Sequence, residues 1–548
     1  MIRMIICYTD ANRGINLRWR DELGERVEKT ITDYRPYFFI RGIEREHDNY
    51  KIKEYGAKLE YGFNYEQGDW KNLNGHVLKK VYVVKPGDIR SARERWSETY
   101  EADVPFHYRY CIDNLDTIPE YKLKKWYWDM EWLPDEHENH GGKITAIVVY
   151  DNYTEEYTTL TWLPNESSEK EMLEQFIDLI QSQDPDMLIA WFGLKFDLPK
   201  LIHRLIANGI DPRKLSPYND VKGVMWKDGG FQTTRSVDNY SPVEQPIRGR
   251  ICLNLDLAFE RQWNDAQKGT LPSLALDYVG EIVLGQKKLV SEKFPDKNDF
   301  FLKGWEEDNK HYLEYAKMDV KLLVDIDEKN YSSESIIALQ RLLVAPFDAC
   351  FYASNMGSIY FMRNAYWKAP TGQRGKKVDY DGAMIYDPLS EGTNGLHIGV
   401  AAFDFAGLYP SMMVSRNISW ETKSQIPTLL GANLATPRNF DPVKSKVMRY
   451  YREDGLGVLP KAVLHLKQLR DEYKVKMKKA YSEGNDNDYT KWYNNQMAVK
   501  RLMASFYGIV AYQGFGWSDV DLAASITASA REAIREAAFK VRELNENE

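Results

Sequence analysis

Cysteine is scarce in this sequence of 548 residues. The few cysteines lie far apart along the chain, and no two of them form a CxxC pair. This spacing excludes the disulfide framework of a small secreted domain and gives no zinc-ligand pattern. We therefore expect buried thiols in a reducing compartment, the cytoplasm. The four cysteines are Cys7, Cys111, Cys252 and Cys350.

Long apolar runs are also missing. No stretch approaches the roughly 18 apolar residues that cross a bilayer, so we expect no membrane span. The apolar run Met4–Cys7 is too short for the hydrophobic region of a signal peptide. Internal repeats and low-complexity tracts are absent as well. With 43% hydrophobic and 28% charged residues, the composition is that of a folded globular protein.

The length and the charge of the chain indicate how many domains it has and which partners it can bind. A single hydrophobic core rarely organises more than about 300 residues, so this chain is expected to contain three or more domains. The 73 Lys+Arg and 81 Asp+Glu residues give a net charge of −8. This balance does not exclude a nucleic-acid partner, because basic residues can gather in patches. The aromatic content of 13% is high, and exposed aromatic rings can stack single-stranded bases.

Two strand patterns organise the first 330 residues. Residues 1–125 alternate short apolar runs with turn signals, as in Tyr37–Ile40 and Val81–Val84, and predict a mixed β domain. In residues 126–330, strand candidates such as Lys143–Tyr150 alternate with helical patterns. That alternation predicts a mixed α/β domain.

The remaining residues predict a helical connection, a second region with strands, and long helices. Residues 331–367 are helical in pattern, and residues 368–460 carry the strand candidate Gly399–Asp404. Two helices follow within residues 461–506. A last helix lies within residues 507–548, where apolar side chains recur on one face. The expected fold class is therefore multidomain α/β, of the α+β type.

Paired carboxylates stand out in the second region. Asp129 and Glu131 lie in a strand candidate, and the period of two places both on one face, as a shared divalent cation requires. Asp197 ends a strand-to-helix turn, and Tyr315 and Asp319 are four residues apart on one helix face. Four carboxylates brought together would hold two Mg²⁺ or Mn²⁺ ions for phosphodiester hydrolysis, with the tyrosine orienting the water. Acidic residues on solvated faces are the alternative.

These segments resemble the three exonuclease motifs of family B DNA polymerases. The D-x-E motif matches Asp129 and Glu131, the F-D ending matches Asp197, and Y-x3-D matches Tyr315 and Asp319. The resemblance implies an RNase H-like 3′–5′ exonuclease domain over residues 126–330. One departure is that Phe192 stands where the family usually has Asn. Because that position contacts the substrate strand, we expect altered efficiency rather than loss.

The segment after the strand candidate resembles polymerase motif A. Asp404 is followed by Phe405-Ala-Gly-Leu-Tyr-Pro-Ser411, with Gly407 in place of the family's Ser. The resemblance implies that Asp404, with the backbone of Phe405, holds the two metal ions of nucleotidyl transfer. It also implies that Tyr409 lies under the incoming sugar and rejects a 2′-hydroxyl. A core strand and turn is the alternative for this segment taken alone.

Basic side chains concentrate in the helices that follow. Residues 461–479 contain seven Lys or Arg against two acidic residues, and Arg470 and Lys474 are four apart, a suitable clamp for a triphosphate. A solvated basic face is the alternative. The segment Lys500–Gly508 resembles motif B, with Ala504 replacing the family's Asn. Residues 461–506 would then be the fingers, and residues 368–460 the first part of the palm. The matching motif B side chains are Lys500, Ser505, Tyr507 and Gly508.

Two further elements extend the resemblance. Tyr380 and Gly382 lie in a Y-x-G-A segment like the one that contacts DNA and helps partition the primer strand in this family. The first domain resembles archaeal members at the segments that form a template-uracil pocket, although a plain core is an equally good interpretation. The candidate pocket residues are Tyr8, Pro36, Tyr37, Ile89 and Arg109.

The D-T-D of motif C is absent from these 548 residues. In the family it closely follows the helix after motif B, here within residues 507–548, and completes the metal site. We therefore expect the large subunit of a split polymerase, with no thumb, whose partner is a smaller polypeptide carrying motif C and the thumb. Primer–template DNA and dNTPs are the expected substrates, and a sliding clamp is a further candidate partner. The alternatives are a stand-alone 3′–5′ exonuclease, or a non-catalytic DNA-binding scaffold with a vestigial polymerase region.

Overall fold

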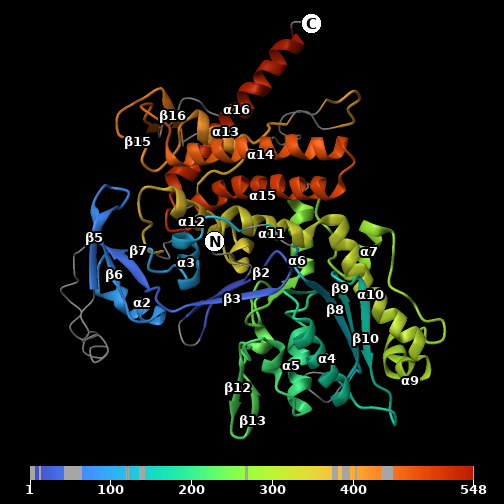
Figure 1. Ribbon diagram of the computed structural model, residues 1–548. Coiled ribbons are helices and arrows are strands. Elements are labelled where there is room, and N and C mark those ends of the chain that lie inside the picture. The colour runs from blue at the N-terminus through green and yellow to red at the C-terminus, as the bar shows by residue number, and fades with distance from the viewer. Residues whose placement is uncertain are drawn as a thin grey trace. The chain divides into compact units, whose positions relative to one another are not determined.

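Contacts within the computed structural model group the chain into two compact units (Figure 1). Unit 1 comprises residues 1–32 and 113–351, and unit 2 comprises residues 33–112 and 352–548. The six domains expected from the sequence are smaller than these units and stay predictions. The structure describes residues 6–10, 14–41, 64–118, 120, 122–134, 142–265, 269–372, 380–384, 395–401, 404–433 and 448–546.

Unit 1 is built on a five-stranded mixed sheet with the order β10-β9-β8-β11-β14. Strands β8, β9 and β10 form an antiparallel meander, and β11 lies parallel to both β8 and β14. This mixture of directions agrees with the α/β pattern expected from the sequence. The strands are β8 (Lys125–Trp132), β9 (Ile144–Asp151), β10 (Glu156–Thr161), β11 (Met187–Ala190) and β14 (Ile251–Asn254).

Helices cover both faces of this sheet. On one face, Trp128 of β8 stacks on Phe176 of α4, with ring centroids 6.2 Å apart, within the main core. On the other face, the Tyr127 hydroxyl donates to Asp327 of α10 at 2.6 Å. Alternation along β8 therefore sends its even-numbered side chains to α4 and its odd-numbered ones to α10. The long helices of unit 1 are α4 (Glu169–Gln183), α5 (Asp197–Ala207), α6 (Leu255–Asp265), α7 (Leu276–Leu284), α10 (Asn309–Asn330) and α11 (Ser332–Leu343).

Local sequence explains where α4 begins and ends. The Ser168 side chain accepts from the Glu171 amide, and the Glu171 side chain accepts from the Ser168 amide, so a capping box starts the helix. Asp184, in the left-handed region, ends it. The shorter elements of unit 1 are η3 (Pro212–Leu215), β12 (Val224–Lys227), β13 (Gly230–Thr233), η4 (Val237–Asn239), α8 (Lys297–Asp299), η5 (Phe300–Gly304), α9 (Trp305–Glu307) and η6 (Phe347–Phe351).

The first three strands of the chain belong to unit 1 and contact its main sheet through ion pairs. Strands β1 (Ile6–Thr9), β2 (Ile15–Arg20) and β3 (Arg26–Ile31) form an antiparallel sheet. Arg20 donates to the fully buried Asp186 at 2.6 Å, just before β11. Since breaking one partner of such a buried pair typically costs about 3–5 kcal/mol, this contact holds the small sheet to the core.

Unit 2 contains two antiparallel sheets. The first has the order β5-β6-β4-β7, and the second has the order β15-β17-β16. Short helical turns η1 (Pro86–Asp88), α2 (Ile89–Ala92) and η2 (Arg93–Arg95) follow β6, and helix α3 (Phe106–Asn114) follows β7. The strands are β4 (Tyr37–Ile40), β5 (Asn64–Lys71), β6 (Val77–Tyr82), β7 (Thr99–Tyr100), β15 (Lys423–Ser424), β16 (Leu430–Asn433) and β17 (Met448–Tyr451).

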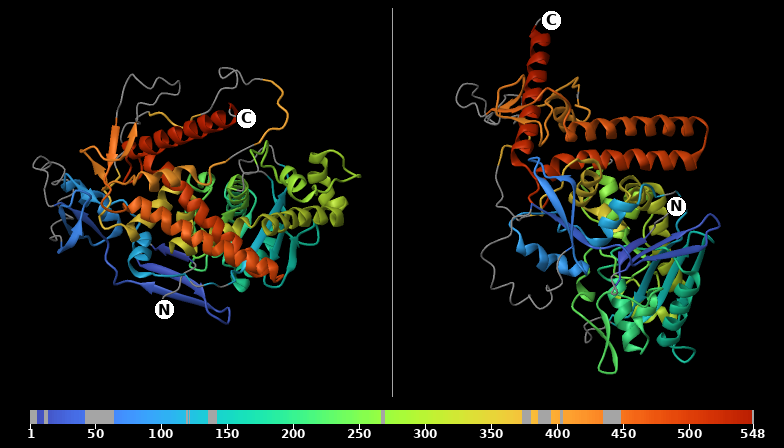
Figure 2. Two further views of the ribbon diagram at one scale, coloured as in Figure 1. Left: turned by 90° about the horizontal axis from the view of Figure 1, so that it is seen from above. Right: turned by 60° about the vertical axis from the view of Figure 1, so that its left-hand side comes forward.

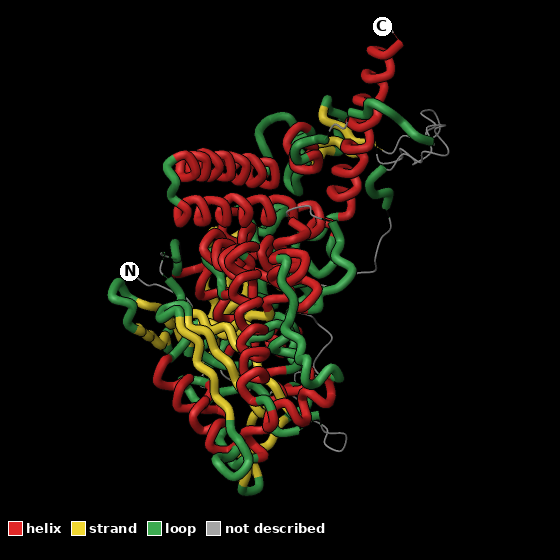
Figure 3. Tube along the Cα trace, turned by 90° about the vertical axis from the view of Figure 1, so that its right-hand side faces the viewer, coloured by secondary structure: helices red, strands yellow, loops and turns green. Residues whose placement is uncertain are grey.

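Long helices dominate the rest of unit 2. Helices α14 and α15 lie side by side and antiparallel, joined by a short loop, in the two views of Figure 2 and again in Figure 3. These are the two helices expected within residues 461–506, and each is several residues longer. The helices are α12 (Ala353–Asn364), α13 (Leu408–Ser415), α14 (Val458–Ser482), α15 (Asp486–Ala511) and α16 (Val520–Glu546).

The strand expected over Gly399–Asp404 is wrong for its described residues. Residues 399–401 and Asp404 belong to no strand and are exposed, and residues 402 and 403 lie outside the described part of the chain. A strand exists only where a neighbour pairs with its backbone, and no described strand lies beside this segment. The apolar side chains of Ile398 and Val400 are accordingly 94% and 75% exposed.

Two findings concern the cysteines and the apolar character of the helices. All four cysteines are buried, as predicted. In the part of the chain that the structure describes, no helix combines the length and the apolar character needed to cross a bilayer.

Candidate active site

Strand β8 places two carboxylates on one face of the unit 1 sheet. Its even-numbered residues Trp126, Trp128 and Met130 are in the core, so Asp129 and Glu131 must point to the opposite face. Glu131 is buried, and Asp129 is partly exposed. The period-two prediction for this pair is therefore confirmed.

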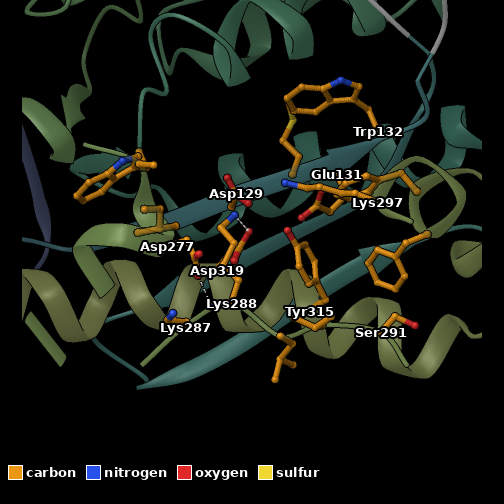
Figure 4. Close-up of a pocket in the computed structure, with 18 of the residues that line it drawn as sticks. Asp129, Glu131, Trp132, Asp277, Lys287, Lys288, Ser291, Lys297, Tyr315 and Asp319 are labelled. Atoms are coloured by element: carbon orange, nitrogen blue, oxygen red, sulfur yellow. Dashed lines mark hydrogen bonds and ion pairs between the residues drawn. The ribbon is translucent and has the colours of Figure 1, made fainter. Parts of the chain in front are cut away.

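Helix α10 brings a third carboxylate to the same place. Tyr315 and Asp319 are one turn apart and both buried, on the face of α10 that packs against β8 and β9. Carboxylate oxygens of Asp129, Glu131 and Asp319 all lie within 4.8 Å of one another. Figure 4 shows the polar ends of these side chains and of Tyr315 facing one another between strand and helix. We call this group the carboxylate cluster.

Asp197 reaches the same pocket from the start of α5. The turn between β11 and α5 holds Phe192 at a φ of 55°, a left-handed conformation that is costly for a bulky residue. The next residue must be Gly193, because a Cβ there would meet the Ala190 Cβ at 2.6 Å. The turn is fixed by the Leu194 amide, which donates to the Asn254 side chain at 2.9 Å. Asp197 is 4% exposed and lines the pocket without belonging to the cluster's tight group.

The pocket above the cluster is large and mostly apolar. Its volume is about 950 Å³, and aromatic and aliphatic side chains surround the carboxylates. Phe196 and Val290 in its wall are 48% and 78% exposed. Aromatic rings in such a wall can stack unpaired bases. Further lining residues include Trp132, Phe192, Leu289, Phe294 and Phe301.

The carboxylates of the cluster and Asp197 are buried close together, which disfavours their ionised forms. Burial, reinforced by neighbouring carboxylates, raises the pKa of Asp129, Glu131 and Asp197. Burial also raises the pKa of Asp319, although Lys288 opposes that effect. Oδ1 of Asp319 is buried and has no hydrogen-bond partner among the described residues. Oxygen ligands that are close, buried and short of positive charge suit a divalent cation such as Mg²⁺ or Mn²⁺.

Lys288 is a site residue that sequence reasoning missed. Its ammonium donates to Asp319 (Figure 4). Burial alone would lower the pKa of Lys288, but Asp319, Tyr315 and Asp129 together raise it. It lies between α7 and α8, outside any helix or strand. No periodicity or motif spacing distinguished it among the 73 Lys and Arg residues.

Tyr315 is placed as the sequence predicted. Its ring packs edge-on against Phe300 at 5.3 Å, and the Lys288 ammonium lies 5.6 Å from the ring centre. Burial raises its pKa, with the carboxylates of the cluster adding to the effect. The hydroxyl is therefore a neutral donor at neutral pH, next to the carboxylates.

The predicted polymerase residues in unit 2 are brought together only in part. The rings of Tyr409 and Tyr507 lie 4.5 Å apart, and the Tyr380 hydroxyl lies 3.1 Å from that of Tyr507. Asp404 and Phe405 are exposed, and no other carboxylate joins Asp404 in a metal-binding group among the described residues.

The basic residues of the finger helices lie along α14 and α15. Arg470 of α14 is half-buried and donates to Gln496 of α15 at 3.2 Å, and Lys474 follows one turn later. Lys500 and Tyr507 are two turns apart on α15, and Gly508 follows directly. A Cβ at Gly508 would meet no atom within 4 Å, so its backbone faces open space.

The candidate uracil-pocket residues belong partly to unit 1 and partly to unit 2. In unit 2, the Arg109 guanidinium lies 5.3 Å from the ring centre of Tyr37 and pairs with Glu101 at 2.6 Å. Pro36 is buried beside Tyr37, but Ile89 packs with Phe38, on the opposite face of β4 from Tyr37. Tyr8 belongs to unit 1, where it packs against Tyr218 with ring centroids 5.7 Å apart. The pocket stays a prediction.

Comparison with known proteins agrees with these motifs. The model for DNA polymerase family B matches residues 347–547, and the model for the family B exonuclease domain matches residues 127–257. The chain is 29% identical to a DNA polymerase of Pyrococcus glycovorans over 576 aligned positions, covering 98% of this chain and 68% of that protein. It is 28% identical to a DNA polymerase of Desulfurococcus sp. (strain Tok), covering 83% of this chain and 57% of that protein.

A solved structure extends the likeness to the fold. The family B DNA polymerase of Pyrobaculum calidifontis matches with a TM-score of 0.73 at 19% identity. The match covers 99% of this chain and 72% of that one. The chain thus spans about 57% of the length of several curated relatives that it matches.

Proposed function

This chain belongs to DNA polymerase family B, and we propose that it carries a 3′–5′ proofreading exonuclease together with part of a DNA polymerase site. The carboxylate cluster carries the exonuclease proposal. Three carboxylates within 4.8 Å of one another, beneath an apolar pocket, suit the hydrolysis of a phosphodiester at an unpaired 3′ end.

Each residue of the exonuclease site has a chemical role in this proposal. Asp129, Glu131 and Asp319 would hold divalent cations with Asp197. When bound, such cations offset the carboxylate charge and act as Lewis acids on the phosphodiester. Tyr315 would orient the attacking water through its neutral hydroxyl. Lys288 would keep Asp319 ionised and in place through their ion pair.

Apolar and aromatic side chains would select the substrate end. Phe196 is 48% exposed on the pocket wall, and its ring lies 6.3 Å from that of Phe192. Unpaired bases stack on such rings, whereas a paired terminus stays in its duplex. The pocket would therefore favour a frayed or mismatched 3′ end over a matched one.

We further propose that the polymerase site is completed by a second chain. Asp404, with the backbone of Phe405, would supply one metal-binding position, and Arg470, Lys474 and Lys500 would contact the triphosphate. Two-metal transfer needs a second carboxylate, and no D-T-D occurs in these 548 residues. A smaller polypeptide bearing motif C and the thumb would provide it.

One assay tests the exonuclease proposal. The purified chain is incubated with Mg²⁺ and a 5′-labelled primer–template with a mismatched 3′ end, without nucleotides. We expect shortening from the 3′ end that the double variant Asp129→Ala/Glu131→Ala abolishes. The matched control is Glu314→Ala. This change removes an exposed carboxylate from α10, next to Tyr315 in the sequence, and should keep full activity. No shortening by the wild-type chain would refute the exonuclease.

Adding dNTPs tests the composite polymerase site. We expect no efficient extension by this chain alone, and extension after addition of a polypeptide with a D-T-D motif. Extension by the chain alone would refute the composite site. If the partner restores nothing, a stand-alone exonuclease is the better description. A chain that binds DNA without degrading it would instead be the non-catalytic scaffold.

A further inference from the structure

The turn between β11 and α5 is held by two side chains from a neighbouring strand and helix. Strands β11 and β14 are parallel, with Ala190 paired to Asn254, so their carboxyl ends meet at one edge of the sheet. The Leu194 amide donates to the side chain of Asn254, the last residue of β14, at 2.9 Å. The Phe192 amide donates to Oδ1 of Asp256, the second residue of α6, at 3.3 Å. Alternate amides of the turn are therefore held from this edge.

The carbonyls of the same turn place Asp197. The Phe192 carbonyl accepts from the Phe196 amide at 3.1 Å. The Gly193 carbonyl accepts from the Leu198 amide at 2.8 Å. These two bonds come immediately before and after Asp197, which is the first residue of α5. A rotation of the peptide groups of Phe192 would therefore move the Asp197 carboxylate.

Asp256 is a costly residue at this position. It is 8% exposed, and no cation pairs with it among the described residues. Burial raises the pKa of Asp256 to about 6. A carboxyl whose pKa is raised by folding stabilises the folded state only at low pH, so the ionised Asp256 is a cost at pH 8. In return, a carboxylate is a strong acceptor for the amide of Phe192, which is held at a φ of 55°.

We propose that Asp256 is a positioning residue of the exonuclease site, which fixes Asp197 beside the carboxylate cluster by holding the Phe192 amide. The inference rests on the proposed function, because Asp197 is one of the residues that would hold divalent cations. Asp256 does not line the pocket, so it acts through the turn. Asn254 supports the same turn through the Leu194 amide.

Cation binding without DNA tests the inference apart from catalysis. Mn²⁺ is titrated into the wild type, Asp256→Ala and Asp256→Asn at pH 8, and the EPR signal of the free ion gives Kd. Loss of a residue that orients a metal ligand typically weakens binding by about 10–100-fold, so Asp256→Ala should raise Kd at least about tenfold. Asp256→Asn keeps an oxygen acceptor for the Phe192 amide and should bind Mn²⁺ nearly as well as the wild type.

A double-mutant cycle separates positioning from general damage. If Asp256 acts through Asp197, Asp256→Ala should add little to the loss of Mn²⁺ affinity in Asp197→Ala. In EDTA at pH 8, the thermal midpoint of Asp256→Ala should stay near that of the wild type, because removal of the buried charge offsets the lost hydrogen bond. If this variant does not fold, Asn254→Ala takes its place, since it removes the acceptor of the Leu194 amide and should also weaken Mn²⁺ binding.

Glu260→Ala is the matched control. Glu260 is half-buried one turn after Asp256 on α6, and among the described residues it makes no hydrogen bond to residues 191–196. Its loss should change neither the Mn²⁺ Kd nor the hydrolysis of a single strand. Asp256→Ala should hydrolyse the single strand about tenfold more slowly and recover part of that loss at higher Mg²⁺, because its cation site is weakened.

Two results would overturn the inference. One is wild-type Mn²⁺ affinity in both Asp256→Ala and Asn254→Ala, and the other is a loss in Asp256→Ala that adds in full to that of Asp197→Ala. Failure of the proposed function looks different, because the wild-type chain would then shorten no 3′ end even if its Mn²⁺ affinity depended on Asp256.

Discussion

Replacing Asp129 by Asn should stabilise the protein while it abolishes the exonuclease. Burial, and next the charge of Asp319, raises the pKa of Asp129 from 3.8 to about 7. A carboxyl whose pKa is raised by folding stabilises the folded state below its unfolded pKa, and that contribution is lost as the pH rises through the folded value. At pH 8 without divalent cations, the ionised carboxylate is therefore a cost.

The size of the effect follows from that difference in pKa. At about 1.4 kcal/mol for each pKa unit, ionising Asp129 in the folded chain costs on the order of 4 kcal/mol at pH 8. An amide of the same shape does not carry this cost. We expect Asp129→Asn to be more stable by about 2–4 kcal/mol in EDTA at pH 8. At roughly 2–4 °C per kcal/mol, the thermal midpoint should rise by at least about 4 °C.

Thermal unfolding in EDTA from pH 5 to pH 8.5 measures the difference. The transition that responds to added Mg²⁺ identifies unit 1, and Glu314→Gln, an exposed carboxylate on α10, is the control. The advantage of Asp129→Asn should grow between pH 5 and pH 8, and Mg²⁺ should stabilise the wild type more than the variant. Parallel pH profiles for wild type and Asp129→Asn, or a less stable variant at pH 8, would refute the electrostatic argument.

Two other substitutions follow from the same pocket. Lys288→Met removes the cation paired with the buried Asp319. We expect the free energy of unfolding in EDTA to fall by about 3 kcal/mol and hydrolysis at the 3′ end to become slower. Calorimetry measures the first effect and the mismatch assay the second, and unchanged stability would contradict the assigned ion pair. Phe192→Asn places a residue that tolerates the left-handed region at a φ of 55°, so the free energy of unfolding should rise by about 1 kcal/mol. The same change removes an aromatic ring from the pocket wall and should raise the KM for a single strand severalfold, and an unchanged KM would rule out a stacking role for Phe192.

The exonuclease site was predictable because it depends on local periodicities. The period of two in β8 gave the shared face of Asp129 and Glu131, and the helical period gave the pairing of Tyr315 with Asp319. Both survive in the structure because tertiary packing agrees with them. The two finger helices were predictable for the same reason, since long helical patterns with a polar turn between them leave few alternatives.

Other features could not be predicted, because they depend on contacts between residues far apart in the sequence. The segment Gly399–Asp404 has the apolar character of a strand, but its described residues have no neighbour to pair with. Lys288 acquires its role only from the buried carboxylate that α10 brings beside it. The uracil pocket stays a prediction, but its residues show the same dependence: Tyr37 and Phe38 point to opposite faces of β4, and Ile89 packs with Phe38.

Strand β8 gives the cluster an unusual sensitivity to insertion and deletion. Its even-numbered tryptophans and its odd-numbered carboxylates alternate along one stretch, so a shift of one residue would exchange the two sets. Asp129 and Glu131 would then enter the hydrophobic core, and the large rings of Trp126 and Trp128 would face α10. Length changes between residues 126 and 131 should therefore be excluded in folded variants, because the core packing of Trp126, Trp128 and Met130 fixes the register of the two candidate carboxylates.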